Sequence, residues 1–276
     1  ADGMQFVTAR GWEDLSELMQ VYESLGLPVD RQVVGQYLQL PRVASDFAGY
    51  LQLYEKYKRV YRVDEVLNGT WEPLRASELA GAPFDEKLGV LSLLLTRLAD
   101  SARELYRLDA LTDALHGDLT AIRDGSATLD ALLDDRQAAL TRRRAAGSTD
   151  RDALLTATRE IERLEAFRTH LRQQSIPAAQ AFDCLKALFS ADVQSRAAAV
   201  DQTDAQIANA FAFLDAAIPD SQELVLFATE LTANFFTSWF IQNFGSEAYF
   251  AHNKRLLFDD THQQLTEAIE QARQQI

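Results

Sequence analysis

DEKLGVLSLLLTRLADSARELYRLDALTDALHGDLTAIR, residues 85–123, is the stretch that decides the fold class. Apolar residues recur through it at helical spacing until Asp124-Gly125-Ser126 breaks the pattern. At 1.5 Å per residue it predicts one helix of roughly 58 Å. The chain has only 12 Gly and 6 Pro among 276 residues, and Ala, Leu, Gln, Glu, Asp and Arg dominate it. We therefore expect an all-α protein.

Two further amphipathic stretches follow this helix, at about 127–145 and 150–173, and Gly147-Ser148 joins them. They carry dense charge of mixed sign, with Leu and Ile at heptad-like steps, which is typical of antiparallel coiled-coil-like helices. We therefore predict that residues 85–175 form a projecting arm of long helices.

The last hundred residues are more apolar. Residues 177–189, 191–217, 221–243 and 246–273 are each predicted to form a helix, and the Phe- and Trp-rich segment ELTANFFTSWFIQNF is expected to lie in the core. Residues 176–276 are therefore predicted to form a C-terminal helical bundle that packs on the long helix.

The first part of the chain predicts a compact module of three helices over residues 1–63. The first helix ends near Gly26, Asp30 caps the second, and Pro41 begins a third that runs to about Tyr61. The predicted buried side of the third helix consists of Val43, Phe47, Tyr50, Leu51, Tyr54, Tyr57 and Tyr61. Residues 64–84 are predicted to be a linker with a short helix, and this is the best domain boundary.

Charge and cysteine content exclude several classes of protein. The formal net charge is −14 and the pI is near 4.7, which argues against a nucleic-acid partner, because that function needs a basic surface. Cys184 is the single cysteine, so no disulfide can form within the chain. No apolar run reaches the roughly 20 residues that span a bilayer, and no signal peptide is recognisable. We expect a cytoplasmic protein with no membrane partner, and the missing initiator Met suggests part of a longer chain.

Motifs of complete active sites are absent from the sequence. It has no GxxxxGK[ST] phosphate loop, no GxGxxG, no CxxC, no HExxH and no GxSxG. A helical di-iron site needs Glu-x-x-His on two helices, and only Asp113-x-x-His116 and Asp259-x-x-His262 approach that pattern. We therefore predict no catalytic and no metal-binding residues. The run Arg142-Arg143-Arg144 is interpreted as a solvated helix end, with an anionic partner as the alternative.

Arg10 is the candidate binding residue. An arginine at the start of a helix is electrostatically unfavourable, because the helix N-terminus already carries partial positive charge. Its place is explained if an anion lies there too, since a guanidinium group forms bidentate bonds with phosphate oxygens. A plain surface arginine is the alternative interpretation.

Three segments resemble one known family. TARGWEDLS (8–16) is similar to the sensor-2 segment of MoxR-type AAA+ ATPases, in which a small-residue-Arg turn and an aromatic residue begin the helical lid. ELTANFFTSWF (230–240) and FGSEAYFAHNKRLLFDD (244–260) resemble the C-terminal helical region of MoxR-like ATPases encoded beside von Willebrand A domain proteins. The similarity covers residues 5–61 and 204–262, and covers the arm only weakly.

The resemblance implies that an ATPase core precedes this lid and helical extension. ATP and Mg²⁺ would bind to that core and not to this chain alone, which would be inactive as an ATPase. It also implies that Arg10 is the sensor-2 arginine, that Trp12 and Leu15 anchor the lid, and that the parent protein is a homo-oligomeric ring. Such a ring would remodel a client or insert a cofactor, together with a von Willebrand A domain protein. Two alternatives stay open: a stand-alone helical scaffold that binds a partner through residues 100–175, and an all-α enzyme.

Overall fold

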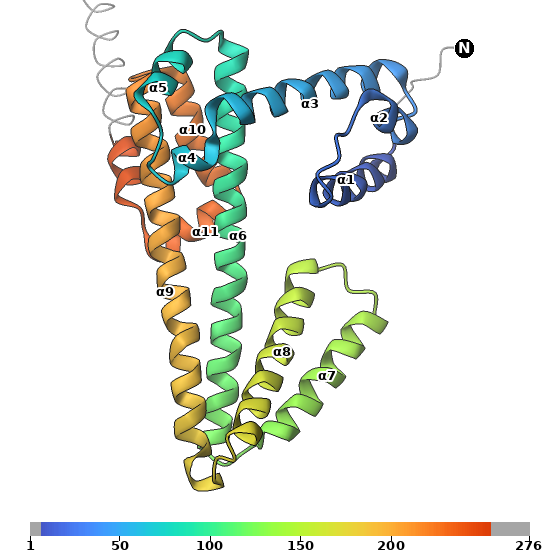
Figure 1. The fold of residues 1–276 in the computed structure, drawn as a ribbon, viewed down its shortest axis with the longest axis vertical. Helices are drawn as coiled ribbons and strands as arrows, with labels where there is room; N and C mark the ends of the chain where they lie inside the picture. The colour runs from blue at the N-terminus through green and yellow to red at the C-terminus, as the bar shows by residue number, and fades with distance from the viewer. Residues whose placement is uncertain (1–6, 255–276) are drawn as a thin grey trace, which may run out of the picture. The chain divides into compact units, whose positions relative to one another are not determined.

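The computed structural model describes residues 7–254, and all regular structure among them is helical, so the all-α prediction is confirmed (Figure 1). The helices are α1 (Ala9–Ser24), α2 (Arg31–Tyr37), α3 (Pro41–Tyr61), α4 (Val63–Leu67), α5 (Pro73–Ala80), α6 (Phe84–Arg123), α7 (Leu129–Ala145), α8 (Arg151–Gln173), α9 (Ala178–Ala217), α10 (Gln222–Ala233) and α11 (Phe235–Phe244). Residues 247–254 are also helical.

The chain divides into two compact units that alternate along the sequence. One unit contains the residues up to Leu94 together with Phe213–Glu223, and the other contains Leu95–Ala212 and the residues from Leu224 onward. Each unit is described below by itself. The sequence-based boundaries after residues 63, 84 and 175 stay predictions.

The first unit contains a three-helix module built from α1, α2 and α3. Local signals set its helix ends: the Asp30 carboxylate accepts from the backbone N–H groups of Gln32 and Val33, each at 2.9 Å, and Pro41 is the first residue of α3. Gly26, with φ of +67°, follows the end of α1. The small core of the module consists of Leu15, Val34, Leu38, Ala44 and Ala48.

The remainder of the first unit connects α3 to the start of α6. The Tyr61 hydroxyl donates to Glu86 Oε1 at 2.8 Å, and burial together with this carboxylate raises the pKa of Tyr61. Trp71 packs edge-to-face on Phe213, with ring centroids 5.3 Å apart. Residues 64–84, predicted to be a linker with one short helix, contain most of α4 and all of α5.

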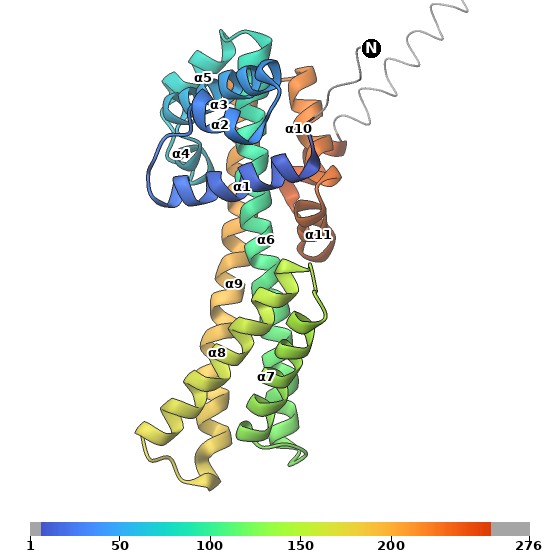
Figure 2. The ribbon, with the colours of Figure 1, turned by 90° about the vertical axis from the view of Figure 1, so that its right-hand side faces the viewer.

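The second unit is organised around a core shared by four helices. Leu115 and Leu119 of α6, Leu133 and Leu140 of α7, Ile161, Leu164 and Phe167 of α8, and Leu185 of α9 form one buried cluster. Both views show α7 and α8 side by side as a hairpin (Figures 1 and 2). Their leucines are therefore buried against α6 and α9 as well as against each other. A coiled-coil geometry for this pair stays a prediction.

The structure corrects two predictions about the last helices. Residues 177–189 and 191–217 are not separate helices, because α9 continues through Ser190 without a Gly, Pro or capping group to end it. The predicted helix over 221–243 is broken at Asn234, whose side chain accepts from the N–H groups of Phe236 and Thr237. This cap starts α11 at an angle of 84° to α10 (Figure 2). Residues 255–273 of the last predicted helix lie outside the described residues.

One predicted core residue of α3 is exposed. The buried residues of α3 are Ala44, Ala48, Tyr57 and Tyr61, whereas Tyr50 is half exposed and stacks on Phe47 with centroids 6.3 Å apart. Small residues allow α3 to approach α1 and α2 closely.

Candidate functional site

Arg10 is the second residue of α1, and its side chain is 88% exposed. Its Nε atom lies 3.8 Å from Asp14 Oδ2, one turn along the same helix. An exposed pair at that distance contributes little to stability and leaves most of the guanidinium donors in water. The Arg10 side chain is therefore accessible to an external anion.

The turn that presents Arg10 is fixed by its two neighbours. The Thr8 hydroxyl oxygen accepts from the Gly11 N–H at 3.1 Å and so caps α1. A Cβ atom at Gly11 would lie 2.9 Å from the carbonyl oxygen of Tyr37, at the end of α2. The absence of a side chain at residue 11 is therefore what lets the first turn of α1 approach α2.

A pair of glycine replacements tests this close approach. Gly11→Ala is expected to lower the free energy of unfolding by about 1–3 kcal/mol, because the added methyl group meets a backbone oxygen that cannot rotate away. A Cβ atom at Gly35, in α2, would meet open space. Gly35→Ala is therefore expected to raise the free energy of unfolding by about 0.4–1 kcal/mol. Urea unfolding of both variants measures the difference. Equal effects of the two substitutions would contradict the packing of α1 on α2.

Trp12 and Leu15, the residues predicted to anchor the lid, occupy different environments. Leu15 is buried in the core of the three-helix module. Trp12 is 38% exposed and packs edge-to-face on Phe47, with centroids 5.0 Å apart. Both side chains therefore pack within the three-helix module.

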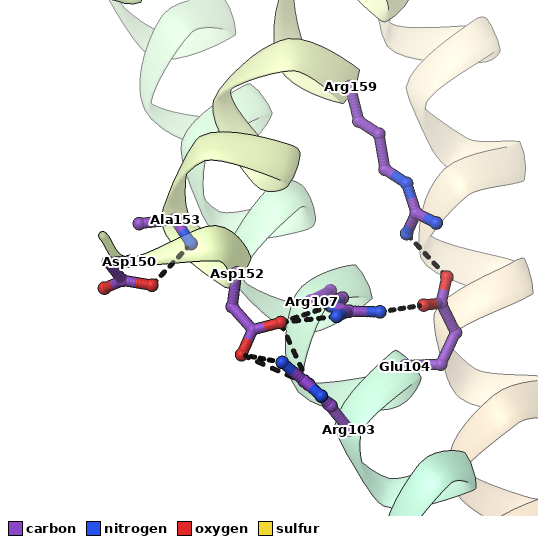
Figure 3. A network of polar contacts seen from close by, with 7 residues as sticks. All are labelled: Arg103, Glu104, Arg107, Asp150, Asp152, Ala153 and Arg159. Carbon is purple, nitrogen blue, oxygen red and sulfur yellow. Dashed lines mark hydrogen bonds and ion pairs between the residues drawn. The ribbon is translucent and has the colours of Figure 1, made fainter. Parts of the chain in front are cut away.

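Sequence reasoning missed a polar network between α6 and α8 in the second unit (Figure 3). Asp152, at the start of α8, accepts from Arg103 Nε at 3.0 Å and from Arg107 Nε at 2.7 Å. Glu104 accepts from Arg107 at 3.2 Å and from Arg159 at 2.5 Å. The sequence signal was the Arg103/Arg107 pair, spaced four residues apart on one helical face.

The electrostatics of Asp152 follow from these two arginines. Burial disfavours its charged form, but the hydrogen bonds from Arg103 and Arg107 outweigh burial and lower its pKa below the ordinary value. The unfolded chain then binds more protons than the folded chain as the pH falls through this range. The contribution of Asp152 to stability is therefore present above its ordinary pKa and is lost on acidification through the lowered pKa.

Asp152→Asn is expected to lower the free energy of unfolding by about 1.5–3 kcal/mol at pH 7, because two arginines lose their charged acceptor. The loss should shrink as the pH falls through the lowered pKa of Asp152, where wild type also carries a neutral side chain. The matched control is Asp150→Asn, two residues earlier, because Asn caps α8 as well as Asp does. Denaturant unfolding at several pH values measures the loss of stability in each of the two variants. An equal loss in the control would show that net charge, and not the network, is responsible.

A second network joins three helices deeper in the same unit. Arg136 of α7 donates to Asp118 of α6 at 2.5 Å and to Glu160 of α8 at 2.7 Å. The Asp118 side chain is 0% exposed, and its Oδ2 atom has no hydrogen-bond partner. Burial, followed by the nearby carboxylate of Asp118, raises the pKa of Glu160. Arg136 therefore links α6, α7 and α8 through these two carboxylates.

The described residues contain no cluster of three or more His, Cys, Asp or Glu side chains that could hold a metal ion. Asp259 and His262, one of the two sequence patterns considered for a metal, lie outside those residues. Arg142, Arg143 and Arg144 are exposed at the end of α7. Within residues 7–254 no single helix is long and apolar enough to cross a membrane, although α10 and α11 together pass that test as a bent pair.

Comparisons with known proteins found no relative of this chain. No family model, no curated protein and no solved structure matches the chain.

Proposed function

We propose that this chain is the C-terminal lid and helical extension of a MoxR-like AAA+ ATPase, with Arg10 as the residue that meets the nucleotide phosphates. The main observation in support is the position of Arg10 in the first turn of α1, where the guanidinium group is exposed and only weakly paired with Asp14. The helix N-terminus and this group together favour an anion. The similarity of residues 8–16 and 230–260 to that family supports the same role.

The described residues fit only one part of a nucleotide site. Arg10 supplies a phosphate contact, while the region from residue 7 to 254 holds no carboxylate cluster suited to Mg²⁺ and no phosphate loop. ATP and Mg²⁺ would accordingly be held by the ATPase core, and Arg10 would link their presence to the position of the lid. The proposal includes a ring of identical subunits, a von Willebrand A domain partner and a cytoplasmic location.

The test uses the chain joined to whatever coding sequence lies upstream, purified with Arg10, with Arg10→Ala and with Arg31→Ala. Arg31 is exposed at the start of α2, so its variant is matched in chemistry and in helix position. We expect Arg10→Ala to reduce ATP turnover at least about tenfold, the effect of one lost charge-assisted contact, and Arg31→Ala to leave it unchanged. The present chain alone should show no turnover.

Three results would contradict this proposal. They are a coding sequence that begins near Met4, ATP turnover by the present chain after repeated purification, and equal turnover of the Arg10 and Arg31 variants. Affinity for a non-hydrolysable ATP analogue, measured on the same proteins, separates loss of binding from loss of chemistry.

The second candidate is a stand-alone helical scaffold that binds a partner through residues 100–175. The observation in its favour is that hydrogen bonds of Asp152 and Arg136 join α6, α7 and α8. These contacts hold the charged surface in a fixed shape. The same experiment decides between the two candidates, because a scaffold needs neither an upstream ATPase core nor Arg10.

A further inference from the structure

Asp118 of α6 and Glu160 of α8 place two carboxyl groups on a single guanidinium group. Arg136 Nη2 donates to Asp118 Oδ1 at 2.5 Å, and Arg136 Nε donates to Glu160 Oε1 at 2.7 Å. The Asp118 side chain is 0% exposed and the Glu160 side chain is 11% exposed. If both carboxyl groups were ionised, two negative charges would face one positive charge where water has little access. An excess charge in such a place is costly.

The neighbouring helices do not supply a second cation to this group. On α7, Asp135 accepts from Arg136 Nη1 at 2.9 Å and so adds another carboxylate to the same guanidinium group. Among the described residues, the charges that act on Glu160 are those of Asp118 and Arg136. His116 of α6 is exposed and lies beside Phe189 of α9. The cations next to Glu160 on α8 are engaged by other carboxylates, in the pairs Arg159–Glu104 and Arg163–Asp192.

The Asp118 carboxylate also lacks a hydrogen-bond donor at its buried Oδ2 atom. An ionised carboxylate only accepts hydrogen bonds, so the missing partner is an O–H or N–H group. The Glu160 carboxyl group lies within hydrogen-bond reach of the Asp118 side chain. Two ionised carboxylates cannot bond to each other, whereas a protonated carboxyl group donates to an ionised one. One proton would therefore supply both the missing donor and the missing positive charge.

We propose that Asp118 and Glu160 share one proton, which Glu160 holds and donates to the Asp118 carboxylate, and that this proton is a pH-sensitive link between α6 and α8. Glu160 is the holder because its side chain reaches water and because glutamate ordinarily keeps its proton to a higher pH than aspartate. Burial and the charge of Asp118 raise the pKa of Glu160 further. The link is independent of the proposed nucleotide contact of Arg10.

Loss of this proton changes how α8 is held. As the pH rises through the raised pKa of Glu160, its carboxyl group becomes an acceptor and can no longer donate to Asp118. The two carboxylates then repel each other across one guanidinium group. We therefore expect the hairpin of α7 and α8 to open more often at alkaline pH than at mildly acidic pH.

The first experiment follows the proton directly, by carbon-13 NMR of the glutamate side-chain carboxyl groups in the full chain between pH 4 and pH 8.5. The Glu160 signal is assigned with Glu160→Gln, and the exposed Glu162 of α8 is the internal control. We expect Glu160 to lose its proton at a higher pH than Glu162. In Asp118→Asn, Glu160 should lose its proton at a lower pH than in wild type, because an amide donates to the ionised carboxylate and carries no charge.

The second experiment tests the link with amide hydrogen exchange of α7 and α8 at pH 5 and pH 8.5. Glu160→Gln is a permanent mimic of the protonated group, because its N–H can donate to Asp118 while its oxygen accepts from Arg136. We expect this variant to exchange like wild type at pH 5. At pH 8.5 it should exchange at least about fivefold more slowly than wild type, the low end of the cost of an unsatisfied buried acceptor. The matched control Glu162→Gln should follow wild type at both pH values.

Three results would overturn the proposal. The first is a Glu160 carboxyl group that titrates together with Glu162 or below it. The second is an unchanged titration of Glu160 in Asp118→Asn, which would mean that burial alone acts on Glu160 and that water satisfies Asp118 Oδ2. The third is equal exchange of wild type and Glu160→Gln at pH 8.5. Thermal melts of each variant confirm that it is folded.

Discussion

Arg136→Met is expected to lower the free energy of unfolding by about 3–5 kcal/mol, because removing one member of a buried ionic group leaves its partners uncompensated. Arg136 is the shared donor to Asp118 and Glu160, and the Asp118 side chain is completely buried. Methionine keeps much of the length of the side chain but supplies no donor. Unfolding in guanidinium chloride, monitored by circular dichroism, measures the loss of stability.

Arg142→Met is the matched control for this substitution. Arg142 lies on the same helix, α7, and is exposed, so its replacement should change stability by less than about 0.5 kcal/mol. A further variant, Asp118→Leu with Arg136→Met and Glu160→Leu, should recover much of the lost stability, since it removes the stranded charges. If Arg136→Met costs no more than Arg142→Met, the buried network does not hold the three helices.

The pH dependence of Glu160 is opposite in sign to that of Asp152. Burial and Asp118 raise the pKa of Glu160 in the folded chain, so the folded chain binds more protons than the unfolded chain in that range. The contribution of Glu160 is therefore fully present below its ordinary pKa and is lost as the pH rises through the raised pKa. In Arg136→Met this loss should deepen, because the cation that favours the charged form of Glu160 is gone.

Phe167→Ala is expected to lower the free energy of unfolding by about 3–5 kcal/mol, the usual range for a fully buried phenylalanine. Phe167 of α8 is fully buried in the core shared by α6, α7, α8 and α9. The Arg163 guanidinium group also lies over its ring at 4.8 Å. The substitution therefore removes both a cation–π contact and the ring that fills the core.

Phe235→Ala provides the comparison on α11. Phe235 is 63% exposed, although its ring packs edge-to-face on Tyr106 at 5.8 Å. Its replacement should cost about 1 kcal/mol or less, the value of one aromatic pair at a largely exposed position. Similar losses in the Phe167 and Phe235 variants would show that α8 is not packed into the shared core.

Helix ends were the part of the fold that local sequence predicted well. Pro41, Asp30 and Asp124-Gly125 mark the predicted helix ends, and the structure has ends at these places. Such signals act over three or four residues, so they are readable without knowledge of the neighbouring helices. Asn234 is the exception, because its capping role lies inside an apolar run that also reads as continuous helix.

The sequence by itself determined that this chain is all-α, since its helix-forming residues far outnumber its breaks. It also predicted that Arg10, at the start of a helix, meets an anion, and this stays a prediction. Only the tertiary structure decided which charges meet, because Arg136 finds Asp118 and Glu160 at separations of 18 and 24 residues. The unpaired Oδ2 atom of Asp118 is likewise visible only after packing, since a polar group lacks a partner only when the chain around it has excluded water.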